Sequence, residues 1–115
     1  MPQRITTAMV RKVTDVTGMD FVDVTAQEGA TLFDLWSPAC APCAALSPIL
    51  DDLARDFADD LRICKANVAA DTTLGEHFSV RSLPTLSLYR DGAEVDRVIG
   101  FRSRAQLTAW IESLL

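Results

Sequence analysis

The sequence has 115 residues, of which 49% are hydrophobic and 23% charged, and its formal net charge at pH 7 is −5. This length fits one domain with one hydrophobic core. The acidic balance and the scattered Lys and Arg residues argue against nucleic-acid binding, which needs clustered basic side chains. The longest apolar runs are too short to cross a bilayer, so no membrane association is expected.

The cysteine content and the first residues both favour an intracellular protein. Three cysteines in this chain are few and odd in number, unlike the dense, even set of a secreted disulfide scaffold. Residues 1–10 lack the apolar run of a secretory signal. We therefore expect a cytoplasmic protein, in which a close cysteine pair is catalytic or metal-binding rather than structural.

Strands and helices are expected to alternate along the chain, after a loose N-terminal segment at 1–9 and within one domain at 10–115. The elements expected in the first half are a strand at 10–16, a short helix at 19–27, a buried strand at 31–36 and a long helix at 40–60. The apolar residues of that long helix recur on one face, and Pro48 inside it predicts a kink. Its acidic residues are expected on the solvated face.

The second half contains the clearest turn and capping signals. The elements expected there are strands at 61–68, 85–89 and 94–99, a short helix at 71–78 and a last helix beginning near Ser103. Asp91-Gly92 predicts a tight hairpin turn, and Ser103 with Gln106 has the spacing of a capping box. The order β-α-β-α-β-α-β-β-α predicts an α/β fold, a mixed central sheet of about five strands flanked by about four helices.

The motif that carries chemistry is Cys40-Ala41-Pro42-Cys43, which lies where a buried strand passes into the long helix. Two intervening residues let the sulfurs approach each other on the first turn. A helix N-terminus favours the thiolate form of the first cysteine, and the thiolate is the nucleophile of disulfide exchange. Pro42 is tolerated there because the first turn needs no N–H from it.

A zinc site is the alternative interpretation of this spacing. Structural zinc sites usually contain two such motifs, and here only Cys64 and His77 are left to complete a set of four ligands. No local spacing supports such a set, so neither metal nor cofactor is expected. Alternation along 61–68 instead predicts that Cys64 is buried, on the face opposite Lys65, with a regulatory thiol as the alternative. His77 is expected to be solvated.

Residues 31–115 resemble the thioredoxin family through nearly the whole fold. The resemblance is carried by Phe33-Asp34-Leu35-Trp36 before the active site, by the CxxC motif itself and by the Pro-containing helix segment 46–53. It is also carried by Val80-Arg81-Ser82-Leu83-Pro84-Thr85, which is similar to the family's cis-proline loop, and by Gly100. These motifs occur in the family's order and spacing.

The resemblance implies a thiol–disulfide oxidoreductase that reduces protein disulfides. Cys40 would attack, Cys43 would resolve, and Asp34 would be a buried carboxylate that moves the proton of Cys43. Lys65 would tune Asp34, and a cis Pro84 would pack against the sulfurs. The residues implied for the substrate groove are Trp36, Leu83, Pro84 and Gly100. The implied partners are protein disulfides and a thioredoxin-reductase-like recycling protein, acting on a monomer.

Three positions depart from the family pattern. Ala39 replaces the usual Trp before the first cysteine, Ala41 replaces the Gly between the cysteines, and Ala44 replaces the Lys that commonly follows the second. An oxidase or isomerase using the same cysteines therefore remains an alternative, as does an adaptor that binds one partner through the groove. The apolar neighbours of Asp34 predict its burial, which favours the enzyme because an adaptor gains nothing from a buried carboxylate.

Overall fold

The computed structural model describes residues 12–115, and over this range the elements follow the expected order. The strands are β1 (Thr14–Val16), β2 (Ala30–Trp36), β3 (Leu61–Asn67), β4 (Thr85–Arg90) and β5 (Ala93–Ile99). The helices are α2 (Phe21–Thr25), α3 (Ala41–Asp56), α4 (Thr72–His77) and α5 (Arg104–Leu114). The expected N-terminal segment at 1–9, and the beginning of the strand expected at 10–16, lie outside the described residues.

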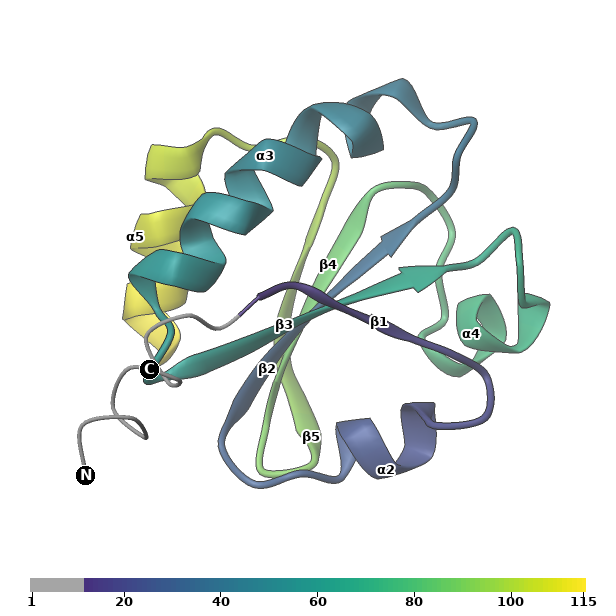
Figure 1. The fold of residues 1–115 in the computed structure, drawn as a ribbon, viewed down its shortest axis with the longest axis horizontal. Helices are drawn as coiled ribbons and strands as arrows, with labels where there is room; N and C mark the ends of the chain where they lie inside the picture. The colour runs from purple at the N-terminus through teal and green to yellow at the C-terminus, as the bar shows by residue number, and fades with distance from the viewer. Residues whose placement is uncertain (1–11) are drawn as a thin grey trace.

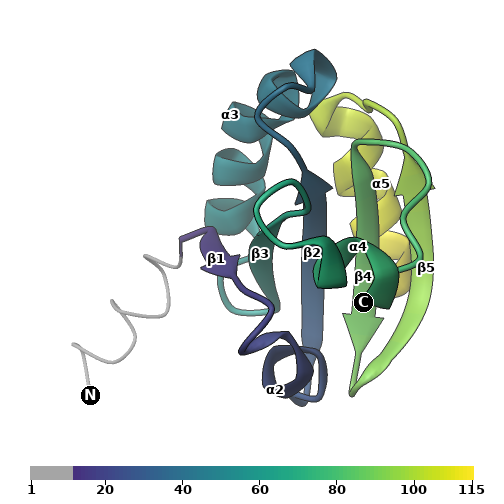
Figure 2. The same ribbon diagram turned by 90° about the vertical axis from the view of Figure 1, so that its right-hand side faces the viewer.

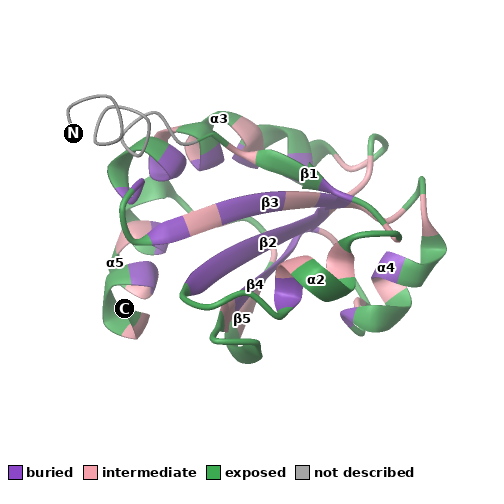
Figure 3. Cartoon of the chain, turned by 60° about the horizontal axis from the view of Figure 1, so that its bottom comes forward, coloured by how far each residue is buried: buried purple, intermediate pink, exposed green. Residues whose placement is uncertain are grey.

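The strands form one mixed sheet in the order β1-β3-β2-β4-β5. β3 runs parallel to both β1 and β2, while β4 is antiparallel to β2 and to β5. This arrangement confirms the predicted fold class. It also makes β2 the central strand, so the residues of β2 are buried by neighbours on both edges as well as by helices (Figure 3).

Helices cover both faces of the sheet. Figures 1 and 2 show α3 and α5 on one face and α2 and α4 on the other. Under α3 and α5 lies the larger core cluster, which includes Leu32, Leu50, Ile63 and Leu107. The second cluster includes Phe33, Cys64 and Leu74. Alternate residues of one strand thus enter different cores, as the period of two requires.

The long helix ends earlier than predicted. It stops at Asp56, because Phe57 adopts φ −112° and ψ 25°, outside the helical region. Phe57 nevertheless remains buried, so the apolar stripe continues into a turn at 57–60. The helix continues through Pro48, and the kink expected there stays a prediction.

Two local predictions from the second half are confirmed. Asp91 and Gly92 both have positive φ, 52° and 88°, which is the backbone of a type I′ hairpin turn between β4 and β5. At α5, the Ser103 side chain accepts from the Gln106 N–H while the Gln106 side chain accepts from the Ser103 N–H. Within residues 12–115 no helix is both long enough and apolar enough to cross a membrane.

Candidate active site

The CxxC motif lies at the N-terminus of α3, where the chain leaves the central strand. Cys40 is the N-cap residue, and its Sγ accepts a hydrogen bond from the backbone N–H of Cys43 at 3.2 Å. The two cysteines form a disulfide, with Cα atoms 5.2 Å apart. Pro42 is exposed in the first turn of the helix, where its missing N–H leaves no hydrogen bond unmade.

The two sulfurs differ in their access to solvent. Cys43 is 3% exposed and packs into the protein, whereas Cys40 is half-buried at the surface end of the helix. Cys40 is therefore the more accessible of the two cysteines. The helix N-terminus places partial positive charge beside Cys40, which stabilises its thiolate in the reduced protein.

Asp34 is a buried carboxyl group in the middle of β2. Its residue is 1% exposed, and neither carboxyl oxygen has a hydrogen-bond partner among the described residues. Burial raises the pKa of Asp34 from 3.8 to about 6, and the positive charge of Lys65 opposes part of that rise. Asp34 therefore changes its protonation state around pH 6 rather than around pH 4.

Lys65 and Trp36 lie beside this carboxyl group. Lys65 is the register partner of Asp34 across the β2–β3 pair, yet its Nζ lies over the Trp36 ring, 4.5 Å from the centroid. The indole Nε1 of Trp36 is buried and has no hydrogen-bond partner among residues 12–115. The lysine thus makes a cation–π contact rather than a direct ion pair with Asp34.

Pro84 and Gly100 meet at the same end of the sheet. The Leu83–Pro84 peptide bond is cis, and the Pro84 carbonyl accepts from the Gly100 N–H at 2.8 Å. Thr85, the residue after Pro84, pairs with Leu35 on β2. The proline loop therefore lies beside the end of the strand that leads to Cys40. Gly100 has φ +91°, a conformation that side-chain-bearing residues rarely adopt.

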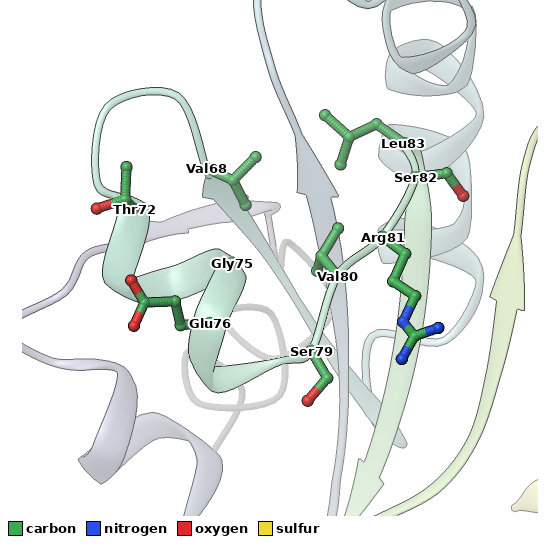
Figure 4. A pocket seen from close by; sticks show the side chains of 9 residues that line it. All are labelled: Val68, Thr72, Gly75, Glu76, Ser79, Val80, Arg81, Ser82 and Leu83. Atoms are coloured by element: carbon green, nitrogen blue, oxygen red, sulfur yellow. The ribbon is translucent and has the colours of Figure 1, made fainter.

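The predicted site residues that line hollows are divided among several of them. Cys40, Cys43, Trp36 and Lys65 line one of about 240 Å³. Leu83 lines a larger one of about 530 Å³ between α4 and the segment 79–83. The side chains of Val68 and Leu83 point toward one another across this larger hollow (Figure 4).

The two residues considered for zinc are far from forming a ligand set with the motif. Cys64 is a free, buried cysteine whose Sγ lies 3.5 Å from Thr14 Oγ1, and burial raises the pKa of its thiol. His77 is exposed, with its ring 4.2 Å from that of Phe21. Within the part of the chain that the structure describes, no three His, Cys, Asp or Glu side chains are grouped to hold a metal ion.

Comparisons of the sequence and of the structure with known proteins agree on one family. The family model for thioredoxin matches residues 12–113. The chain belongs to the thioredoxin family. This thioredoxin-family protein is 34% identical over 106 residues to a thioredoxin from Pseudomonas aeruginosa, covering 91% of the chain and 98% of that protein. It is 36% identical over 103 residues to a thioredoxin from Staphylococcus saprophyticus, with coverages of 90% and 98%.

A solved structure agrees with these sequence relatives. A point mutant of a thioredoxin from Halobacterium salinarum superposes with a TM-score of 0.79 at 29% identity, covering 90% of this chain and 89% of that one. Family membership and a CxxC pair at disulfide distance together establish thiol–disulfide oxidoreductase activity for this thioredoxin-family protein.

The sequence predictions missed an exposed apolar pair that flanks Gly100. Ile99 is 50% exposed and Phe101 is 44% exposed, at the same sheet end as the proline loop. Arg102 holds this segment by donating to the carbonyls of both residues, at 3.2 and 2.9 Å. The sequence signal for this pair was a phenylalanine next to Gly100, directly after a strand, since adjoining exposed apolar side chains can mark an interaction surface.

Proposed function

We propose that this protein reduces protein disulfides by dithiol–disulfide exchange, with Cys40 as nucleophile and Cys43 as the resolving cysteine. The Cys40 thiolate attacks one sulfur of the substrate disulfide, forms a mixed disulfide and releases a substrate thiolate, which takes up a proton. The Cys43 thiolate then attacks Cys40 Sγ. This second step forms the Cys40–Cys43 disulfide, releases the other substrate thiol and completes the transfer of two electrons to the substrate.

The observation that carries this assignment is the difference in exposure between the two sulfurs. Cys40 is half-buried at the helix N-terminus and Cys43 is 3% exposed. Only Cys40 is open to a protein substrate, and only Cys43 is held within the same turn to displace that substrate. The N–H of Cys43 also points at Cys40 Sγ, which favours negative charge on that sulfur.

Asp34 serves in this proposal as the proton acceptor for Cys43, directly or through water. Cys43 must lose its proton before it attacks, in a buried site where bulk solvent is excluded. A carboxyl group whose pKa is about 6 is ionised at pH 7 and basic enough to accept a proton, which suits general base catalysis. Lys65 tunes this group because its positive charge lowers the pKa of Asp34.

The substrate segment docks along Trp36, Leu83, Pro84 and Gly100. Support comes from the Gly100–Pro84 hydrogen bond, from the hollow lined by Leu83 and from the hollow that Trp36 lines with the two cysteines. Ile99 and Phe101 add apolar surface at this edge. Ala39 is exposed but contributes only a methyl group, so we expect weaker general docking than an aromatic residue at that position would provide.

A recycling partner has to return two electrons to the Cys40–Cys43 disulfide after each turnover. We assign this role to a thioredoxin-reductase-like protein, in a reducing cytoplasm and with the oxidoreductase acting as a monomer. A redox titration separates this reductase from the oxidase alternative. A potential near about −270 mV supports the reductase, and one near about −120 mV supports an oxidant.

The cysteine assignment is tested with single substitutions and a disulfide substrate such as insulin. Cys40→Ser should abolish reduction, whereas Cys43→Ser should accumulate a mixed disulfide visible by non-reducing electrophoresis. Cys64→Ala is the matched control, because this buried thiol lies outside the site, and it should reduce the substrate normally. Normal turnover by Cys43→Ser, or trapping by Cys40→Ser, would reverse or exclude the assignment.

A further inference from the structure

Three charged side chains lie in one row across the sheet near the active site. Asp15 on β1 is the register partner of Lys65 on β3, and Lys65 is the register partner of Asp34 on β2. Neighbouring strands are about 4.8 Å apart, so register partners lie side by side. The lysine therefore stands between two carboxylates, one buried and one exposed.

All three side chains project from the same face of the sheet. The residue two positions before each of them packs in the core under α3 and α5: Val13, Leu32 and Ile63. The residue adjacent to each packs in the opposite core: Val16, Phe33 and Cys64. Because side chains alternate along a strand, Asp15, Lys65 and Asp34 share the face that α3 covers, the helix that carries Cys43.

Lys65 does not pair with the buried carboxylate beside it. The Asp34 oxygens accept no hydrogen bond from the described residues, and the Lys65 ammonium lies over the Trp36 ring instead. Asp15, Lys65 and Trp36 line one cavity of about 400 Å³, together with Asp71. This outer cavity, which Asp34 does not line, is bounded by the Trp36 ring and by two carboxylates, those of Asp15 and Asp71.

The other charged side chains near Asp15 and Lys65 have other partners or line other cavities. Lys12 and Arg62 line a further cavity with Asp15, but Arg62 donates to Glu28 O and Thr31 Oγ1. Asp71 accepts from the N–H and hydroxyl groups of Thr73 at Oδ1, and it is not a register partner of Lys65. Asp15 is therefore the carboxylate that is in register with Lys65 and lines the same cavity.

We propose that Asp15 is a positioning residue that, with the Trp36 ring, holds the Lys65 ammonium in the outer cavity and away from Asp34. Without that hold, the ammonium would turn along the same face toward the buried carboxylate. Asp34 would then gain a counter-ion and lose its proton at lower pH. The inference rests on the proposed function only where it takes Asp34 as the proton acceptor of Cys43. The position of Lys65 can be tested without measuring disulfide reduction.

The test is a pH titration of the Asp34 carboxyl carbon by NMR in the oxidised protein. In Asp15→Asn the midpoint of Asp34 should fall by about one pKa unit or more, the size expected when an ammonium comes within about 4–6 Å of a carboxylate. Asp59→Asn is the matched control, because Asp59 is exposed in the turn before β3. It should leave the midpoint unchanged.

A second background separates positioning from a simple long-range charge effect. In Lys65→Gln there is no ammonium to hold, so adding Asp15→Asn should move the Asp34 midpoint much less than in the wild type. An equal shift in both backgrounds, or no shift from Asp15→Asn alone, overturns the proposal. A shift of the midpoint without a matching shift in the pH profile of disulfide reduction supports the positioning role and counts against Asp34 as the base.

Discussion

Replacing Asp34 by alanine should stabilise the protein at neutral pH while slowing its reaction. Burial raises the pKa of this carboxyl from 3.8 to about 6, so the folded state holds the proton more tightly than the unfolded chain does. At 1.36 kcal/mol for each pKa unit, the rise corresponds to about 3 kcal/mol. The ionised carboxyl costs this amount in the folded state.

The sign of the pH dependence follows from the direction of that shift. For a carboxyl whose folded pKa is raised, the stabilising contribution is fully present below the unfolded pKa, near 4. It is lost as the pH rises through the folded pKa, near 6. Relative to the wild type, Asp34→Ala should therefore gain about 2 kcal/mol in unfolding free energy between pH 4 and pH 7.

Urea unfolding at pH 4 and pH 7 measures this gain. The cavity left by the missing carboxyl destabilises the variant, but it does so equally at both pH values, so the difference between them isolates the ionisation. Asp34→Asn keeps the shape and should show the same pH dependence, while Asp59→Ala, at an exposed position, should show little. A stability difference that is the same at both pH values would refute the reasoning, and full activity of Asp34→Ala would remove its proposed role toward Cys43.

Two further predictions concern docking and folding. Ala39→Trp adds an aromatic surface beside Cys40 and should raise kcat/KM for insulin reduction roughly fivefold, on the usual scale of aromatic contacts; an unchanged rate would favour a dedicated partner that does not use position 39. Ser103→Ala removes the capping box of α5 and should lower the unfolding free energy in urea by about 1 kcal/mol, whereas a loss no larger than that of the exposed Ser113→Ala would mean that the cap contributes little.

Much of the fold was predictable because its signals are local. The Asp91-Gly92 turn needs two residues that tolerate positive φ, and the capping box needs two side chains three residues apart, so neighbours in the chain specify both. The buried strand before Cys40 and the amphipathic helix after it could likewise be predicted from short stretches of sequence. The end of α3 was not, because buried Phe57 extends the apolar stripe beyond the last helical turn.

The candidate site likewise has some features that local sequence predicts and others that depend on the folded sheet. The spacing of the CxxC motif places Cys40 and Cys43 in one helical turn, and the residues beside Asp34 in the chain are apolar. The position of Lys65 between Asp34 and Asp15, with its ammonium over Trp36, follows instead from how the strands pair in the folded protein. Strand register depends on contacts between residues far apart in the chain, which no local window contains. The spacing of Cys40 and Cys43 can therefore be predicted from the sequence, whereas the positions of Asp15, Lys65 and Asp34 relative to one another depend on the register of the sheet.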